Sequence, residues 1–517
     1  MRLVVVLIAC VALGLGAAAP AVADDTPATP GPDEAVEAVL DRRMPSSGVP
    51  GVAYAVVADG QVTNVGVRGV VRAGTGDDVT PDTPFPAGSI TKSVTALAVM
   101  QLVEAGRVDL DSAVAEYLDG FAGGPAAGVT VRQLLSHTSG FSTRQGNTSH
   151  TDATGDGDEL ARRVDRLAGL TLSRTPGVTW EYSNANYLVL GRLVEVVSGE
   201  DYDTYVQREI LQPLAMADSF VADGEVHEDM ATGHRPWFGT KRPLPEDRTE
   251  RGMAPAGGLV ASAPDLASYL LAMMNGEDDV LSAEGKALMM RPAGPASSFY
   301  GLGWFVDDGD GSVWHSGSVP GAESLAVMRP SEGTAAVVLV NGGSGIGFGE
   351  TTALREGVTG TALGLDGPDD GSRWTQQALF VGLVLLPLAY LLSIVWAWRH
   401  RDAIRAKAGF PGLFSLWFPL VSTSVAAWVM LRLVPDLVGA PLGTLRLFQP
   451  DLGLLLISGA VTGVLWATVR LVIAHTGGTS AKERPQERRR PRGRPEVRHE
   501  NRARHQPSRG SESHAPG

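Results

Sequence analysis

The sequence predicts an α/β domain followed by three transmembrane helices. Runs typical of β-strands lie near both ends of residues 33–365, at "VAYAVVADGQVTNVGVRG" (52–69) and again over 312–341, with segments of helical periodicity between them. Three apolar stretches of membrane-spanning length then follow within the 517-residue chain. Turn residues between the later β-runs favour adjacent antiparallel strands.

The chain begins with the features of a cleavable secretory signal. Residues 1–23 start with Met-Arg, continue as the apolar run "LVVVLIACVALGLGAAA" and end in "AVA". The only cysteine, Cys10, lies inside this run, so the exported domain, 24–365, has no disulfide framework and depends on its core. Lipidation of Cys10 is the weaker alternative, because the apolar run continues past it.

The three apolar stretches are predicted to be transmembrane helices at 376–398, 413–434 and 451–474, after a short linker at 366–375. Each has about the twenty residues that a helix needs to cross a hydrocarbon core, and none shows a polar face. Arg432 and Arg470 lie close enough to helix ends to extend toward the membrane surface.

Charge predicts the orientation of these helices. The first connection, "RHRDAIRAKAG", and the tail, 475–517, are basic, whereas the second connection, 435–450, carries only Arg446 against Asp436. Because basic segments stay in the cytoplasm, we expect the large domain outside the cell membrane and the tail inside. The tail has too few apolar residues to pack and is expected to be disordered, with anionic lipid as its partner rather than nucleic acid.

The segment "SITKSVTALAVMQLVEAG" (89–106) predicts a core helix that starts near Ser89. Unpaired N–H groups at a helix N-terminus favour negative charge developing nearby, as on a nucleophilic hydroxyl. Lys92, three residues later, lies on the same face and can accept the serine proton if burial lowers its pKa. The alternative is an N-cap serine beside a surface lysine. The sequence has five lysines, and only Lys92 has a serine three positions before it.

A second candidate motif is Tyr182-Ser-Asn184, just before the helical segment "ANYLVLGRLVEVV". In an extended segment these two side chains project to the same side. A phenol near Lys92 can share a proton relay, and the Asn184 carboxamide can hold a substrate amide. The alternatives are a half-buried aromatic and an N-cap asparagine.

The third candidate motif, His315-Ser-Gly317, ends a predicted strand. Gly317 would let a substrate backbone lie close to that strand. The backbone N–H of Ser318, together with that of Ser89, is a candidate oxyanion hole.

These three motifs, in this order, resemble those of the penicillin-recognising serine hydrolases, in which Ser-x-x-Lys is the signature of β-lactamases and penicillin-binding proteins. The Tyr-x-Asn form is similar to the branch of class C β-lactamases, D-Ala-D-Ala carboxypeptidases and esterases. The supporting flanking segments are "LLSHTSG" (134–140), "YSNANYLVLG" (182–191), "PAGGLVASAPDLASYL" (255–270) and "YGLGW" (300–304).

The resemblance implies a β-lactamase/transpeptidase-like fold: an antiparallel sheet flanked by helices plus a helical subdomain, with Ser89 in a cleft between them. It makes Ser89 the acylated nucleophile, and Lys92 and Tyr182 the proton carriers. His315 stands where lysine is common, which puts strong β-lactamase activity in doubt because histidine is mostly neutral at pH 7. His137 is expected to be structural, since that segment is structural in the family.

We therefore expect a membrane-anchored extracytoplasmic serine hydrolase that acts on a peptide, amide or ester, such as a cell-wall peptide. Neither a metal nor a cofactor is required. A β-lactamase is one alternative. A non-catalytic cell-wall sensor coupled to the three helices is another, although a pure binder does not need a nucleophile beside two bases.

Overall fold

The protein is described here by a computed structural model over residues 32–151, 158–246, 248–365 and 372–476. The predicted signal, 1–23, lies outside these residues, as does all of the predicted tail except its first two positions.

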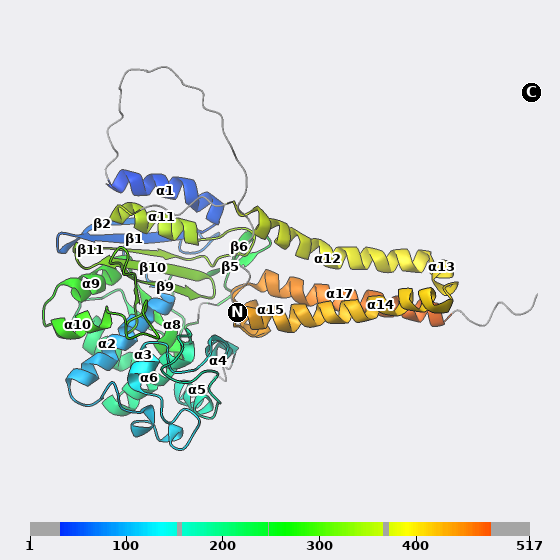
Figure 1. Cartoon of the computed structure of the whole chain (residues 1–517). Helices are drawn as coiled ribbons and strands as arrows, with labels where there is room; N and C mark the ends of the chain where they lie inside the picture. The colour runs from blue at the N-terminus through cyan, green and yellow to red at the C-terminus, as the bar shows by residue number, and fades with distance from the viewer. Residues whose placement is uncertain (1–31, 152–157, 247, 366–371, 477–517) are drawn as a thin grey trace, which may run out of the picture.

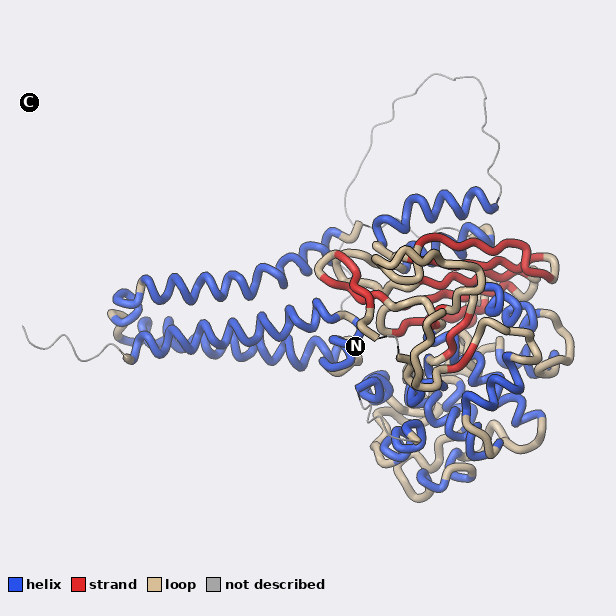
Figure 2. The backbone as a smooth tube through the Cα atoms, turned by 180° about the vertical axis from the view of Figure 1, so that it is seen from behind, coloured by secondary structure: helices blue, strands red, loops and turns tan. Residues whose placement is uncertain are grey.

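A six-stranded antiparallel sheet forms the centre of the large domain. Its spatial order is β2-β1-β11-β10-β9-β8, so the first two strands of the chain join the last four. The strands are drawn in red in Figure 2. Val52 lies opposite Val340 in one pair and Leu325 opposite Val338 in the next. The strands are β1 (Gly51–Ala58), β2 (Gln61–Gly69), β8 (Phe305–Val306), β9 (Val313–Val319), β10 (Ala322–Arg329) and β11 (Thr334–Val340).

Helices cover both faces of this sheet (Figure 1). Apolar side chains of α1 (Pro32–Ser47) and α11 (Thr352–Leu363) pack on one face, against residues such as Val52 and Val338. The other face contributes to a larger core shared with α2 (Thr91–Glu104) and α9 (Ala263–Met274). Alternate residues of β11 enter these two cores, as the period of a strand requires.

A helical subdomain lies beyond α2, between the early and late strands in sequence. Its α6 (Asn184–Ser198) is buried along most of its length and packs against α2, which fixes the position of the segment that precedes it. The remaining α-helices of the domain are α3 (Val131–Leu135), α4 (Thr143–Thr148), α5 (Glu159–Ala168), α7 (Tyr202–Val206), α8 (Ala254–Gly257) and α10 (Ala283–Met289). Two small sheets are formed by β3 (Phe85–Pro86), β7 (Leu259–Ala261) and β4 (Phe220–Val221), and by β5 (His234–Trp237) and β6 (Thr240–Pro243).

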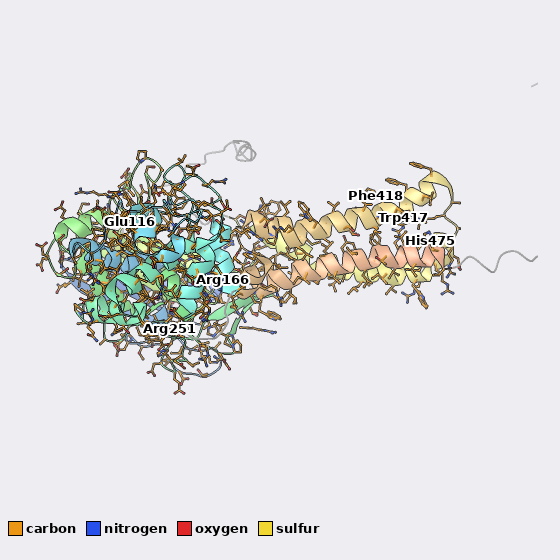
Figure 3. The ribbon with its side chains drawn as sticks, turned by 90° about the horizontal axis from the view of Figure 1, so that it is seen from below. Glu116, Arg166, Arg251, Trp417, Phe418 and His475 are labelled. Carbon is orange, nitrogen blue, oxygen red and sulfur yellow. The ribbon has the colours of Figure 1, made fainter. Side chains whose placement is uncertain are left out.

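Three helices in the described chain are long and apolar enough to cross a membrane: Trp374–Arg399, Gly409–Leu437 and Pro450–His475. Each contains one of the predicted stretches and extends beyond it by one to four residues. The labelled aromatics Trp417 and Phe418 are about half exposed on the bundle (Figure 3). The elements are α12 (Trp374–Arg399), α13 (Arg401–Arg405), α14 (Gly409–Trp428), a π-helical segment (Val429–Leu433), α15 (Val434–Leu437), α16 (Leu442–Phe448) and α17 (Pro450–His475).

The two connections in this bundle lie at opposite ends of it. The basic one, with α13, lies at the end far from the large domain, and α15 lies beside the domain (Figure 1). Arg432, at the domain end, pairs with Asp436 at 3.1 Å, and Arg470 donates to the Ser415 carbonyl at 3.3 Å. Both arginines therefore have protein partners.

Candidate active site

Ser89 lies in a tight 3₁₀ turn, Gly88–Ile90, that leads directly into α2. Gly88 has a φ of +56°, and a Cβ there would come within 2.6 Å of the Ser318 nitrogen. This turn therefore needs glycine, both for its backbone conformation and for its close approach to β9. The Ser89 side chain, the next in the chain, is only partly buried.

Lys92 is fully buried one turn later. Its Nζ lies 3.0 Å from Ser89 Oγ and 2.6 Å from the Ala256 carbonyl oxygen, to which it donates. Burial lowers the pKa of this amine well below 10.5, and among the described residues no carboxylate raises it again. A neutral Nζ can donate one hydrogen to Ala256 and accept the Ser89 proton on its lone pair.

Tyr182 closes the other side of this pair. Its ring centroid lies 5.0 Å from Lys92 Nζ, and its interaction with the Ser89 side chain lowers the pKa of Tyr182, against the larger effect of burial. Burial raises the pKa of Tyr182, so the hydroxyl keeps its proton near pH 7. Because burial lowers the pKa of Lys92 and raises that of Tyr182, Lys92 is able to accept a proton and Tyr182 is able to donate one.

His315 lies in the buried part of β9, with its ring centroid 6.2 Å from that of Tyr182. Its Nδ1 faces the Ser316 carbonyl at 2.7 Å, and its Nε2 lies 3.3 Å from the Tyr300 hydroxyl. Burial, together with the charge of Lys92, lowers the pKa of His315 to about 3. The imidazole is therefore neutral at pH 7 and supplies no permanent cation for a substrate carboxylate.

Gly317 and Ser318 bring β9 against the Ser89 turn. A Cβ on Gly317 would lie 2.0 Å from the Ala87 carbonyl oxygen, to which Ser324 Oγ donates at 2.7 Å. Only glycine allows this approach, which places the Ser318 nitrogen next to Gly88. The Ser318 nitrogen, one of the two backbone groups predicted for an oxyanion hole, therefore lies beside the residue that precedes Ser89.

Gly317→Ala is expected to separate β9 from the turn. Inserting a methyl group into such a contact costs about 1–3 kcal/mol, so we expect a lower melting temperature and slower acylation of Ser89. Gly128→Ala is the matched control, because no atom lies within 4 Å of a Cβ there. A Gly317→Ala protein with the melting temperature and acylation rate of the control would contradict this account.

Asn184 is the predicted site residue whose side chain is turned elsewhere. Its Nδ2 donates to Asn147 Oδ1 at 3.2 Å and lies 3.4 Å from His150 Nε2. No hydrogen bond between Asn184 and Ser89 or Lys92 is found in the described residues. Nor is Asn184 the N-cap, because Ser183 takes that position and α6 begins at Asn184. Its Oδ1 is buried and has no partner among the described side chains and backbone groups.

His137 supports the Tyr182 segment without touching Ser89. Its ring centroid lies 4.3 Å from that of Tyr182, and its Nδ1 accepts from the Ser183 N–H at 3.2 Å. Burial lowers the pKa of His137 well below 6.5, which keeps the ring neutral. These contacts agree with the predicted structural role of this residue.

Several contacts of the site were not predicted. The Ala256 carbonyl and the Tyr300 hydroxyl carry no sequence signal of their own, although both lie in segments quoted for the resemblance. Asn147 and His150, whose side chains contact Asn184, lie in α4 and in the 3₁₀ turn Ser149–Thr151 that follows it, and the sequence predicted neither element.

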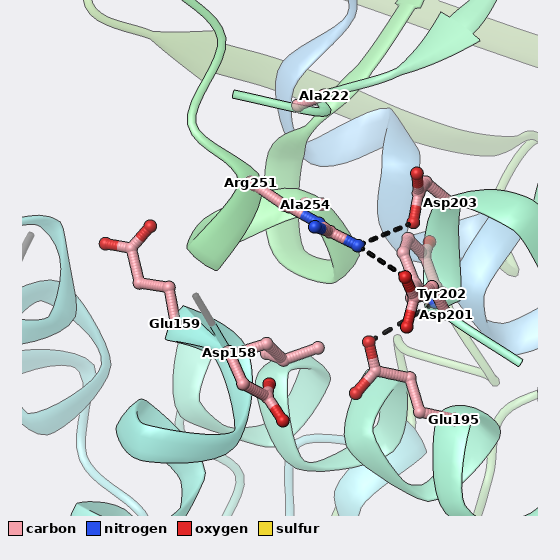
Figure 4. A pocket seen from close by; sticks show the side chains of 10 residues that line it. Asp158, Glu159, Glu195, Asp201, Tyr202, Asp203, Ala222, Arg251 and Ala254 are labelled. Atoms are coloured by element: carbon pink, nitrogen blue, oxygen red, sulfur yellow. Dashed lines mark hydrogen bonds and ion pairs between the residues drawn. The ribbon is translucent and has the colours of Figure 1, made fainter. Parts of the chain in front are cut away.

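A cavity of about 310 Å³ lies elsewhere, between α5, α6, α7 and α8 (Figure 4), and none of the predicted site residues lines it. Arg251 crosses it to pair with Asp201 at 2.7 Å. Within the described residues, no group of three or more His, Cys, Asp or Glu side chains is arranged to hold a metal ion.

Comparison with known proteins gives consistent results. The Beta-lactamase family model matches residues 36–360. Penicillin-binding protein 4 of Amycolatopsis lactamdurans is 35% identical over 344 residues, which cover 62% of this chain and 88% of that protein. Protein flp of Staphylococcus aureus is 26% identical over 313 residues, and the match spans 62% of its length.

Two solved structures are also similar. The octameric penicillin-binding protein homologue from Pyrococcus abyssi has a TM-score of 0.56 and 28% identity, covering 64% of this chain and 77% of its own. The D-amino acid amidase from Ochrobactrum anthropi SV3, complexed with L-phenylalanine amide, has a TM-score of 0.52 and 25% identity, covering 61% and 92%.

Proposed function

The chain belongs to the Beta-lactamase family, and from that premise we propose that it is a membrane-anchored extracytoplasmic serine hydrolase that forms an acyl-enzyme on Ser89. The observation that carries the proposal is the 3.0 Å contact between Ser89 Oγ and the Nζ of a fully buried Lys92. A nucleophile beside a base with a lowered pKa is the arrangement that covalent catalysis requires.

The proposed acylation starts with proton transfer from Ser89 Oγ to the neutral Nζ of Lys92. Oγ bonds to the substrate carbonyl carbon, and the oxyanion lies near the N–H groups of Ser89 and Ser318. Tyr182 donates its proton to the leaving amine or alcohol as the carbonyl re-forms, and is reprotonated from Lys92. Water then hydrolyses the Ser89 ester and releases the acid.

The pH dependence of acylation should report the lowered pKa of Lys92. Protonated Lys92 cannot accept the Ser89 proton, so the rate rises with pH through that pKa and is level above it. Because burial places the pKa well below 10.5, we expect the level region to include pH values well below 10.5. Stopped assays of fluorophosphonate labelling measure this profile. A rate that keeps rising up to about pH 10.5 would show an unperturbed lysine.

The substrate class can be tested by comparing the turnover of an ester, an amide and a β-lactam. The neutral His315 and the amidase and penicillin-binding relatives favour a peptide, amide or ester over a β-lactam. We expect the full-length protein to turn over a p-nitrophenyl ester or a D-amino acid amide faster than a chromogenic cephalosporin. Faster turnover of the cephalosporin would make it a β-lactamase. Absence of turnover and of any covalent adduct would favour the sensor alternative.

The proposed location places the large domain outside the cell membrane and residues 475–517 in the cytoplasm, near anionic lipid. The basic connection with α13, at the far end of the bundle, supports this orientation. Protease added to intact cells is expected to digest the large domain and spare an epitope placed at the C-terminus. Digestion of the epitope instead would reverse the topology.

A further inference from the structure

The short helix α8 carries the carbonyl that meets Lys92. Lys92 Nζ donates to the Ala256 carbonyl oxygen at 2.6 Å and lies 3.0 Å from Ser89 Oγ. A neutral amine has one lone pair, so the direction of its bond to Ala256 limits where that lone pair points. Proton transfer from Ser89 therefore depends on where α8 lies.

Thr95, one turn beyond Lys92 on α2, holds α8 in place. Its fully buried Oγ1 lies 2.7 Å from the Pro255 carbonyl oxygen, in the residue before Ala256. Helix α6 leaves room for Pro255 on the other side, because a Cβ on Gly191 would lie 2.1 Å from the Pro255 ring. Helix α8 is thus seated between α2 and α6, and the Thr95 hydroxyl bonds it to α2.

The hydrogens available to these groups give the bonds a direction. The Pro255 carbonyl can only accept, so the hydrogen of the Thr95 hydroxyl lies in that 2.7 Å contact. Thr95 Oγ1 also lies 2.7 Å from the Tyr202 hydroxyl, which must then supply the hydrogen of this second bond. Burial raises the pKa of Tyr202, so its hydroxyl keeps that hydrogen. The bonds therefore run from Tyr202 through Thr95 to Pro255.

A further pair of bonds ties the segment that follows α8 to the same helix. The Leu259 N–H donates to Thr91 Oγ1 at 2.9 Å, and Thr91 Oγ1 donates to the Gly88 carbonyl at 2.6 Å. Thr91 therefore joins this segment to the turn that carries the nucleophile. With the Thr95 bond at its other end, the segment is attached to α2 on both sides of the Ala256 carbonyl.

We infer that Thr95 and Tyr202 are positioning residues for the base: through α8 they hold the Ala256 carbonyl against Lys92 and so direct its lone pair toward the nucleophile. The inference rests on the proposed function, because it concerns the same proton transfer. It extends the site to two buried hydroxyl groups that act through a backbone carbonyl.

The pH dependence of acylation separates the positioning of Lys92 from general support of the fold. A carbonyl stabilises a charged ammonium more strongly than a neutral amine, so loosening Ala256 lowers the pH at which Lys92 becomes neutral. The other titratable side chains that face Lys92 are His137, Tyr182, Tyr187 and His315. None of them forms a hydrogen bond with α8 in the described residues.

The test measures the rate constant of fluorophosphonate labelling against pH on the full-length protein, with the final labelled fraction as the measure of folded protein. Thr95→Val is expected to lower the rate constant about tenfold, and the midpoint of the profile by about 0.5 in pH, the scale of one buried hydrogen bond. Thr95→Ser, which keeps the hydroxyl, is expected to stay within about threefold of wild type. Tyr202→Phe is expected to lower the rate constant about threefold, with the midpoint moving in the same direction.

Thr359→Val is the matched control, because in the described chain the buried Thr359 hydroxyl donates only within its own helix, α11. If Thr95→Val does not fold, its labelled fraction falls and Tyr202→Phe decides. A rate constant or a midpoint that matches the control, in every variant that folds, would overturn the inference alone. Unlabelled wild type would overturn the proposed function and the inference with it.

Discussion

Ser89→Ala is expected to lower the hydrolysis of a p-nitrophenyl ester by roughly 10⁴- to 10⁶-fold, the scale seen when a catalytic nucleophile is removed. The substitution removes the oxygen that lies 3.0 Å from Lys92 Nζ. Alanine retains the backbone N–H groups of the turn, so a small residual rate is expected.

Ser93→Ala is the matched control. Ser93 lies on the same helix and is buried, and its hydroxyl donates to the Ile90 carbonyl at 2.8 Å rather than meeting Lys92. We expect its kcat/KM to stay within about tenfold of wild type, since only a local hydrogen bond is lost. Equal losses in both variants would mean that damage to α2, and not loss of a nucleophile, explains the effect.

Lys92→Arg is expected to slow acylation by about 10²- to 10⁴-fold, the range attributed to a positioned general base. Arginine can still donate to Ala256 and Ser89, but it does not deprotonate in proteins. The substitution therefore separates a base from a hydrogen-bond donor. The rate of fluorophosphonate labelling measures it.

Lys286→Arg is the control for Lys92→Arg. Lys286 is also buried, but its Nζ is held by Asn275, the Glu277 carbonyl and Asp279, far along the chain from the site. We expect its labelling rate to match wild type. If Lys92→Arg labels as fast as this control, Lys92 does not act as the base.

Much of the fold could be predicted because its signals are local. Alternating β-runs at 52–69 and 312–341 predict antiparallel strands, and this prediction is confirmed by the sheet that joins β1 to β11 and β9 to β10. The three apolar stretches predicted three helices of membrane-spanning length, which are present. Periodicity suffices for such elements because it determines which face is buried.

Contacts within the site could be predicted from the sequence only where both partners lie in one short segment. The i, i+3 spacing of Ser89 and Lys92 places them on one helical turn, and the structure has them in contact. The partner of Lys92, the Ala256 carbonyl, is 164 residues away and is a backbone atom, so no residue type signals it. The partners of Asn184, Asn147 and His150, likewise lie in a different segment, in and just after α4.

The side-chain environment of His315 could not be predicted either. From the sequence, the imidazole was expected to be mostly neutral at pH 7 because of the ordinary pKa of histidine. Its burial in β9, together with the charge of Lys92, lowers that pKa to about 3, so the imidazole is neutral at pH 7. Burial depends on the assembled sheet and helices, which single-residue reasoning does not supply.

The covalent bond to Ser89 is the central claim, and intact mass spectrometry tests it most directly. The full-length protein is incubated with a fluorophosphonate or a fluorescent penicillin, quenched in denaturant, and compared with Ser89→Ala. We predict a single added mass with at least one of these probes on wild type, located by peptide mapping at Ser89, and none on Ser89→Ala. An adduct that persists in Ser89→Ala, or a wild-type mass unchanged by both probes, would contradict the account.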